Sequence, residues 1–203
     1  LGVASGIFDV FVSIVVSVYI LLQRKQIYGF FNKLTMAIFD KKTCDKIGEY
    51  IDSTNRIFFK FISSQVIDGI IVGILVTIAM SIIGVKYAVL LGFMIGLFNV
   101  IPYFGAIIAV AISILITLIT GGISQTLIMA IVVIILQQID SNIINPKIIG
   151  NSLEISPLLV IFAVTVGGAY FGVLGMFLAV PVVAVLKILI NDWLEFKNKK
   201  KYA

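Results

Sequence analysis

Long apolar runs separated by short polar segments form the dominant pattern of this chain. The runs cover residues 7–22, 61–85, 87–101, 103–120, 126–139 and 158–190, and the first can be extended back to Leu1. A helix needs roughly 20 apolar residues to cross the hydrocarbon core of a bilayer. We therefore predict an all-α fold: a polytopic helical bundle that is integral to a membrane.

Two parts of this pattern predict helices that do not cross the membrane in one piece. Pro102 separates residues 87–101 from residues 103–120, and the 15 residues before it span about 22 Å at 1.5 Å per residue. That length is short for a full crossing, so residues 87–101 form either a tilted span or one half of a re-entrant hairpin. The glycines of the last run divide it into two segments, and Pro181 bends the final helix. The bundle should therefore contain broken or re-entrant helices.

Residues 23–60 have a different character. They contain eight of the fifteen Lys and Arg residues, and their apolar positions recur at the spacing of amphipathic helices. The segment "DKKT", residues 40–43, predicts a break between two helices, with Thr43 as the N-cap of the second. This arm is either a solvated helical hairpin or an interfacial, oligomerising element.

Composition and charge support a membrane protein and set its orientation. The chain is 61% hydrophobic and 12% charged, whereas a globular domain is about 45–50% apolar and about 25% charged. Its mean hydropathy is +1.18 and its net charge is +5. The basic residues lie beside apolar runs, which indicates cytoplasmic segments rather than nucleic-acid binding. If each later segment crosses fully, six crossings separate the two basic segments.

These patterns predict four regions. We expect a transmembrane helix, a cytoplasmic or interfacial amphipathic arm, a transmembrane transport core and a basic cytoplasmic tail, in that order: residues 1–22, 23–60, 61–190 and 191–203. The first run lacks the basic segment and cleavage site of a signal peptide. Because the chain begins without Met, we also expect it to be a fragment that further helices precede.

The residue types that are absent exclude several chemistries. With one cysteine (Cys44) and no histidine, the chain cannot form a disulfide framework, a Cys/His metal site or a Ser–His protease. The "GxGD" pattern of aspartyl intramembrane proteases is also absent. We therefore expect no enzymatic activity, no cofactor and no metal.

The polar stretch "QQIDSNIINPKIIGNSLEISP", residues 137–157, interrupts the apolar pattern most strongly. Pro146 removes a backbone donor and disfavours helix at Asn145, so we expect a broken-helix junction with unwound backbone carbonyls. Discontinuous helices are where transporters bind hard cations through oxygen atoms, and an Asp could exchange a proton for a cation. The alternative is an ordinary wet loop. The candidate contacts are Gln137, Asp140, Asn142, Asn145 and Pro146, and Lys147 is a possible ion partner of Asp140.

Two further polar groups interrupt apolar runs. Pro102 breaks its helix, Asn99 can satisfy freed backbone groups, and Tyr103 could line a pathway or anchor at the interface; the alternative is a tight turn. Asp68 lies a few residues into another span, where ionisable groups usually face a cavity or a partner. It is followed by Gly69 and Gly73, spaced as in the close-packing motif GxxxG.

The segment "GLFNVIPYFGAI" and the stretch that begins at Gln137 resemble the autoinducer-2 exporter family, also called PerM-like permeases. The match is specific from about Gly84 to Leu189, although Ala106 stands where the family commonly has Pro. The resemblance implies a multi-pass protein of the bacterial inner membrane that forms a homo-oligomer. It also implies a secondary transporter that exports a small polar solute.

The alternatives that stay open are a sodium or lithium/proton antiporter and an oligomeric channel-like protein. The expected partners are the lipid bilayer and a small polar solute or a monovalent cation or proton. No nucleic-acid partner is expected.

Overall fold

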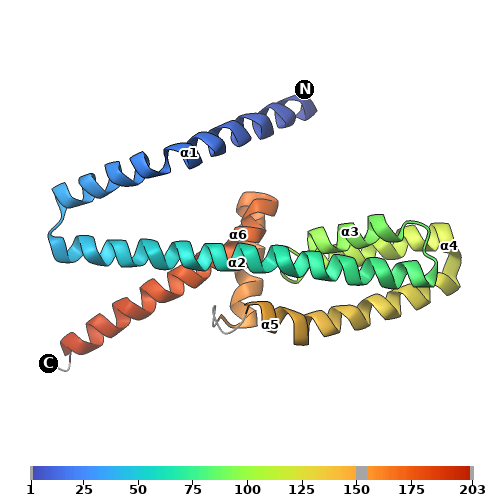
Figure 1. The fold of residues 1–203 in the computed structure, drawn as a ribbon. Coiled ribbons are helices and arrows are strands. Elements are labelled where there is room, and N and C mark those ends of the chain that lie inside the picture. The colour runs from blue at the N-terminus through green and yellow to red at the C-terminus, as the bar shows by residue number, and fades with distance from the viewer. Residues whose placement is uncertain (1, 150–154, 202–203) are drawn as a thin grey trace. The chain divides into compact units, whose positions relative to one another are not determined.

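The computed structural model describes residues 2–149 and 155–201, which are almost entirely helical and contain no β-strand (Figure 1). The elements are α1 (Gly2–Ile38), α2 (Lys41–Ile83), α3 (Ala88–Phe98), α4 (Phe104–Ile139), the π-helical turn η1 (Asp140–Ile144), α5 (Asn145–Ile149) and α6 (Pro157–Lys201). Within these described residues, three stretches are long and apolar enough to cross a membrane: Lys41–Ile83, Phe104–Ile148 and Pro157–Glu195. The predicted all-α membrane fold is confirmed.

The chain forms two compact units, residues 1–52 and residues 53–203. In the first unit, α1 is one continuous helix that joins the predicted first span to the first part of the predicted arm. The predicted break between two helices is present, but Thr43 is not the residue that precedes the second helix. That residue is Asp40, whose carboxylate accepts a 2.6 Å hydrogen bond from the Thr43 hydroxyl. This bond lowers the pKa of Asp40 below its ordinary value of 3.8.

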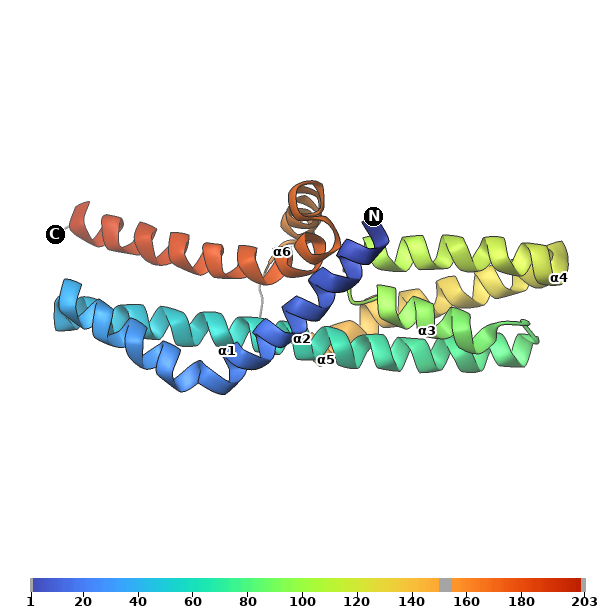
Figure 2. The same cartoon turned by 90° about the horizontal axis from the view of Figure 1, so that it is seen from above.

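The second unit is built from helices that reverse direction at glycines. After α2 ends, Gly84 (φ +79°) turns the chain so that α3 runs back alongside it (Figures 1 and 2). Gly122 (φ +76°, ψ 179°) divides α4 into two arms, and Gly172 (φ +62°) divides α6 in the same way. These conformations are open to glycine and strained for other residues. The expected division of residues 158–190 at its glycines is therefore observed.

Helix α3 is too short to cross a bilayer. Its 11 residues extend about 16 Å, roughly half of the hydrocarbon core. The first arm of α4 returns antiparallel to it, so the turn at Gly84 and the bend at Gly122 lie at the same end of this unit (Figure 1). The short helix and the antiparallel return are compatible with the re-entrant hairpin predicted for residues 87–101, which stays a prediction.

Direct backbone contact joins α2 to α3. Gly69 and Gly73 of α2 face Gly96 and Gly92 of α3, and a Cβ atom built on Gly69 would lie 2.5 Å from the Gly96 carbonyl oxygen. No side chain fits between the two helices there, which is the close packing that GxxxG permits. An apolar core continues from this contact into α4; its fully buried members include Val76, Met80, Leu91, Ile95, Met129 and Val133.

Helix α6 packs against α2 around Phe61, which precedes the segment of α2 that contacts α3. The Phe61 ring lies 5.7 Å from the Phe177 ring, centroid to centroid, and Phe61 shares a second apolar cluster with Val164 and Val180. Helix α2 therefore contacts both α3 and α6, at different levels along its length.

Candidate functional site

Three buried polar side chains from three different elements meet in the second unit. The Asn99 amide nitrogen donates a 2.8 Å hydrogen bond to Asp68 Oδ2 and a 3.2 Å hydrogen bond to Asp140 Oδ2. Asp68 is fully buried, and Asp140 and Asn99 are 4% and 8% exposed. The side chains are separated by 31 and 41 residues in the chain, so only the fold brings them together. We call Asp68, Asn99 and Asp140 the carboxylate cluster.

The contact between α2 and α3 positions Asn99 beside Asp68. Asn99 is the C-cap residue of α3, and its backbone N–H donates to the Ile95 carbonyl, so the helical register determines where its side chain points. The Gln65 side chain, one turn before Asp68, donates a 3.1 Å hydrogen bond to the Val100 carbonyl. Helix α2 thus holds both the end of α3 and the turn that follows it.

Asp140 ends α4, where its N–H donates to the Leu136 carbonyl, and begins a π-helical turn. Pro146 has no backbone N–H, and its ring would clash with the carbonyl of Asn142 in a regular α-helix. The chain instead widens at Asp140–Ile144, where the Asn145 N–H donates to the Asp140 carbonyl, five residues back. Turns of this kind occur frequently at functional sites. The expectation of unwound backbone carbonyls is wrong for residues 140–149, because the helix widens and then continues to Ile149.

The carboxylate cluster contains two acidic groups and no basic group. Both carboxylates bind the same nitrogen atom, so their Oδ2 atoms lie no more than about 6 Å apart. Two negative charges at that distance repel by about 3 kcal/mol at an effective dielectric constant of ~20. Lys147, the possible ion partner, is exposed and makes no hydrogen bond to Asp140. A proton or a cation would remove this repulsion.

Several polar atoms of the two aspartates, and of the glutamines three residues before each of them, are buried and lack a partner. They are Asp68 Oδ1, Asp140 Oδ1, Gln65 Oε1 and Gln137 Nε2. Leaving a buried polar atom without a partner costs about 1–3 kcal/mol. Three of these four atoms are oxygens, which are the ligands that hard cations prefer. The surroundings therefore suit a small positively charged species.

The remaining predicted residues lie in less buried positions. Gln137 is half-buried, three residues before Asp140, whereas Asn142 is exposed and donates a 2.7 Å hydrogen bond to the Gln138 carbonyl. Asn145 and Pro102 are half-buried, and Pro146 and Tyr103 are exposed. The structure thus brings together three of the nine predicted residues, with Gln137 on the adjoining turn.

Gln65 is a site residue that sequence reasoning did not select. It is 1% exposed, and its side chain connects α2 to the turn after α3. The signal that could have identified it is its spacing: Gln65 lies three residues before Asp68, which places both side chains on one face of α2.

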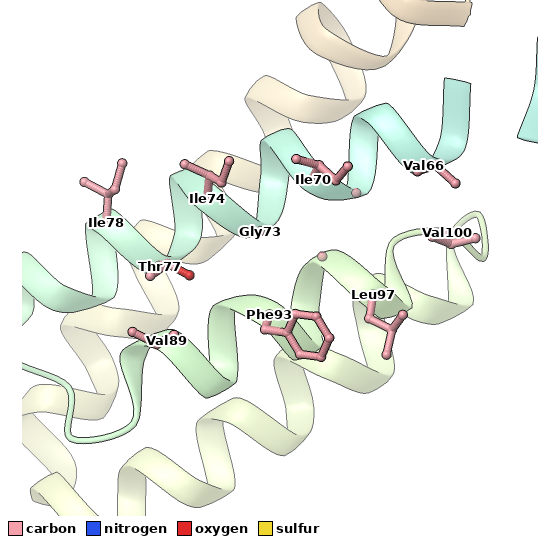
Figure 3. A pocket seen from close by; sticks show the side chains of 12 residues that line it. Val66, Ile70, Gly73, Ile74, Thr77, Ile78, Val89, Phe93, Leu97 and Val100 are labelled. Atoms are coloured by element: carbon pink, nitrogen blue, oxygen red, sulfur yellow. The ribbon is translucent and has the colours of Figure 1, made fainter. Parts of the chain in front are cut away.

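An apolar groove of about 440 Å³ lies along α2 and α3 but contains no member of the cluster (Figure 3). Its walls are branched and aromatic side chains, including Ile70 and Ile74 of α2 and Phe93 of α3, and Thr77 supplies a hydroxyl. The polar chemistry of this unit is therefore separate from its apolar groove.

The fold and the cluster define the class: an all-α membrane protein whose apolar helices enclose a polar, acidic site. The family model of the AI-2E family transporter matches residues 1–195, and the chain belongs to that family. The resemblance stated above is confirmed.

Relatives from other bacteria are similar to this chain. YrrI of Bacillus subtilis, named for an inferred transport role, is 36% identical over 139 residues, which cover 68% of this chain and 39% of YrrI. YueF of the same organism is 35% identical and covers 70% of this chain and 37% of YueF. A relative in Borreliella burgdorferi is 26% identical over 91% of this chain and 52% of its own length.

The chain therefore spans between about a third and about half of the length of these relatives. The family and the names of the relatives indicate a transporter rather than an enzyme.

Proposed function

We propose that this chain contributes the ion-binding site of a secondary transporter, in which the carboxylate cluster binds one proton or one monovalent cation. The observation that carries this proposal is the shared Asn99 amide, which holds two buried carboxylates close together without a basic partner. Coupling-ion sites of transporters are typically located where helices are interrupted within the membrane. Here α3 ends at the cluster and α4 passes into the π-helical turn.

A proton and a cation would compete for this site. Either one cancels one negative charge and reduces the repulsion between Asp68 and Asp140, and both use the same carboxylate oxygens. When both carboxylates are buried, the bound species is enclosed, so release requires α3, η1 or both to move. Alternating occupancy by a proton and a cation is the exchange that a cation/proton antiporter performs.

The expected export of a small polar solute is compatible with this site, because the bound ion could be coupled to solute movement. A sodium or lithium/proton antiporter is the second candidate, in which the ion is itself the transported species. The composition of the cluster favours the second candidate: beyond two carboxylates it contains one amide group, which suits an ion better than a larger solute.

We further propose that the protein is a multi-pass protein of the bacterial inner membrane, without catalytic activity, and that it forms homo-oligomers surrounded by lipid. Exposed apolar side chains support the contact with lipid: Phe11, Leu21 and Leu22 of α1 are at least 64% exposed. Lipid tails would cover such surfaces.

The test is ion and solute flux in proteoliposomes that contain the whole protein, with imposed proton, sodium, lithium and autoinducer-2 gradients. Asp68→Asn and Asp140→Asn each remove one carboxylate charge and should abolish coupled flux. Asp192→Asn, on an exposed position of α6, is the matched control and should retain it.

If both cluster variants transport like the unmodified protein, the cluster is not the ion site. Sodium- or lithium-driven proton movement without a solute would favour the antiporter. Autoinducer-2 flux that depends on an ion gradient would favour the exporter.

A further inference from the structure

Tyr103 adopts a strained backbone conformation between α3 and α4. Its φ and ψ angles are +64° and −57°, and the Phe104 N–H donates a 2.8 Å hydrogen bond to the Pro102 carbonyl. These features define the rare γ-turn with positive φ. Tyr103 is the single non-glycine residue with positive φ in the described part of the chain.

The surroundings of the turn enforce this conformation. A Cβ atom on Gly105 would collide with the Phe98 carbonyl, so the chain doubles back on itself with no spare room. The Gly105 N–H donates to the Ile101 carbonyl, and Gln65 holds the Val100 carbonyl from α2. Strained residues persist where neighbouring structure over-determines them, and they concentrate at functional sites.

The strained turn follows closely after the residue that bridges the two carboxylates. Asn99 lies four residues before Tyr103, and its amide binds Asp68 and Asp140. The end of α3 opens when Asn99 leaves both carboxylates and Gln65 leaves the Val100 carbonyl, and the turn then no longer has to hold Tyr103 at positive φ. Four residues therefore separate the side chain that bridges the carboxylates from the residue with the strained backbone.

We propose that Tyr103 is a positioning residue whose backbone strain opposes the closed cluster and so sets how readily α3 opens. This inference rests on the proposed function, in which the cluster must open to exchange its ion. The closed state is held by the hydrogen bonds of Asn99 and Gln65 and weakened by the turn. Strain of this kind changes an equilibrium constant by about five- to 150-fold.

Replacing Tyr103 by glycine in one variant and by alanine in another separates the effect of the backbone strain from the effect of the aromatic ring. Glycine adopts positive φ without penalty, so Tyr103→Gly removes the strain. Alanine retains a Cβ atom and therefore the strain, while it removes the ring. The Tyr103 side chain is 48% exposed, so loss of the ring removes little buried contact.

The experiment measures opening of α3 through a reporter cysteine at Ile95, which is fully buried, in a Cys44→Ser background. A thiol reagent can reach that cysteine when α3 separates from its partners. We expect Tyr103→Gly to be labelled about five- to 150-fold more slowly than Tyr103→Ala and to melt at a higher temperature. Tyr103→Ala should be labelled at the rate of the parent.

A purely structural role for Tyr103 predicts the opposite sign, because glycine would loosen the turn and speed labelling. Faster labelling of Tyr103→Gly, or equal rates for the glycine and alanine variants, would overturn the proposal. Labelling needs no ion gradient, so its outcome is independent of transport. If the glycine and alanine variants differ clearly in labelling rate but the protein moves no ions, the proposed function is rejected and the role of the strained turn stands.

Discussion

Gly69→Ala tests whether the approach of two backbones determines the geometry of the carboxylate cluster. The added Cβ atom would lie 2.5 Å from the Gly96 carbonyl oxygen, whereas ordinary van der Waals contact begins at 3.4 Å. Neither atom belongs to a flexible side chain, so α3 must move away from α2 by roughly 1 Å to restore ordinary contact between the added Cβ atom and the Gly96 carbonyl.

This displacement acts directly on Asn99, which follows Gly96 by less than one turn. Its 2.8 Å hydrogen bond to Asp68 would lengthen beyond the limit for such a bond, about 3.5 Å. Overpacking costs about 1–3 kcal/mol, and a lost hydrogen bond to a charged group about 1.5–3 kcal/mol. We therefore expect a loss of stability of about 2–6 kcal/mol and at least a tenfold loss of coupled flux.

Gly73→Ala is the matched control for this substitution. It places the same methyl group on the same face of α2, one turn later, but 3.2 Å from the Gly92 carbonyl oxygen, so a shift of a few tenths of an ångström is sufficient. Thermal unfolding and proteoliposome flux of the two variants should differ clearly. Equal effects of the two substitutions, or normal flux of Gly69→Ala, would refute the link between helix approach and the cluster.

Two further substitutions test the start of α2 and the turn that follows α4. Pro146→Ala restores a backbone N–H and removes the ring, so the π-helical turn should revert to α-helix and rotate the residues after Asp140 by about 100° relative to α4. We expect a more stable helix with reduced flux, and normal flux would show that transport does not need the π-helical turn. Thr43→Val removes the hydroxyl that lowers the pKa of Asp40, so carbon NMR should show this pKa moving up toward 3.8. Because the folded pKa of Asp40 is lowered, this carboxylate stabilises the start of α2 fully above pH 3.8, and the stabilisation disappears as pH falls through the folded pKa. Thr43→Val should weaken this dependence of stability on pH. An unchanged titration of Asp40 would show that the Thr43 hydroxyl is not the cause of the lowered pKa.

The helices and their interruptions could be predicted from the sequence because lipid imposes a simple rule. Apolar runs of membrane length become helices, and Pro102 and the glycines of the last run interrupt them. Prediction failed where two local signals competed. Threonine is a good helix cap, but Asp40, three residues before Thr43, is the residue that precedes the helix. Its carboxylate accepts a hydrogen bond from the Thr43 hydroxyl. Pro146 disfavours a regular helix, and a wider turn satisfied the same constraint without unwinding.

The individual residues of the site could be predicted from the sequence, but not that they lie together in the fold. Asp68, Asn99 and Asp140 stood out because a polar side chain in an apolar run is costly. Their convergence depends on the glycine contact between α2 and α3, which joins residues far apart in the sequence, and on the path of α4 up to Asp140. The same features turned Asn142 outward and brought Gln65 inward.

The apolar core beyond Asp68 limits the routes by which an ion could leave the carboxylate cluster. Val72, Val76 and Met80 continue the buried face of α2 for about 18 Å after Asp68, and none is more than 2% exposed. This apolar layer separates the two carboxylates from the end of the bundle where Gly84 and Gly122 lie. A charged particle released in that direction would have to enter closely packed, mostly apolar side chains, which costs several kcal/mol.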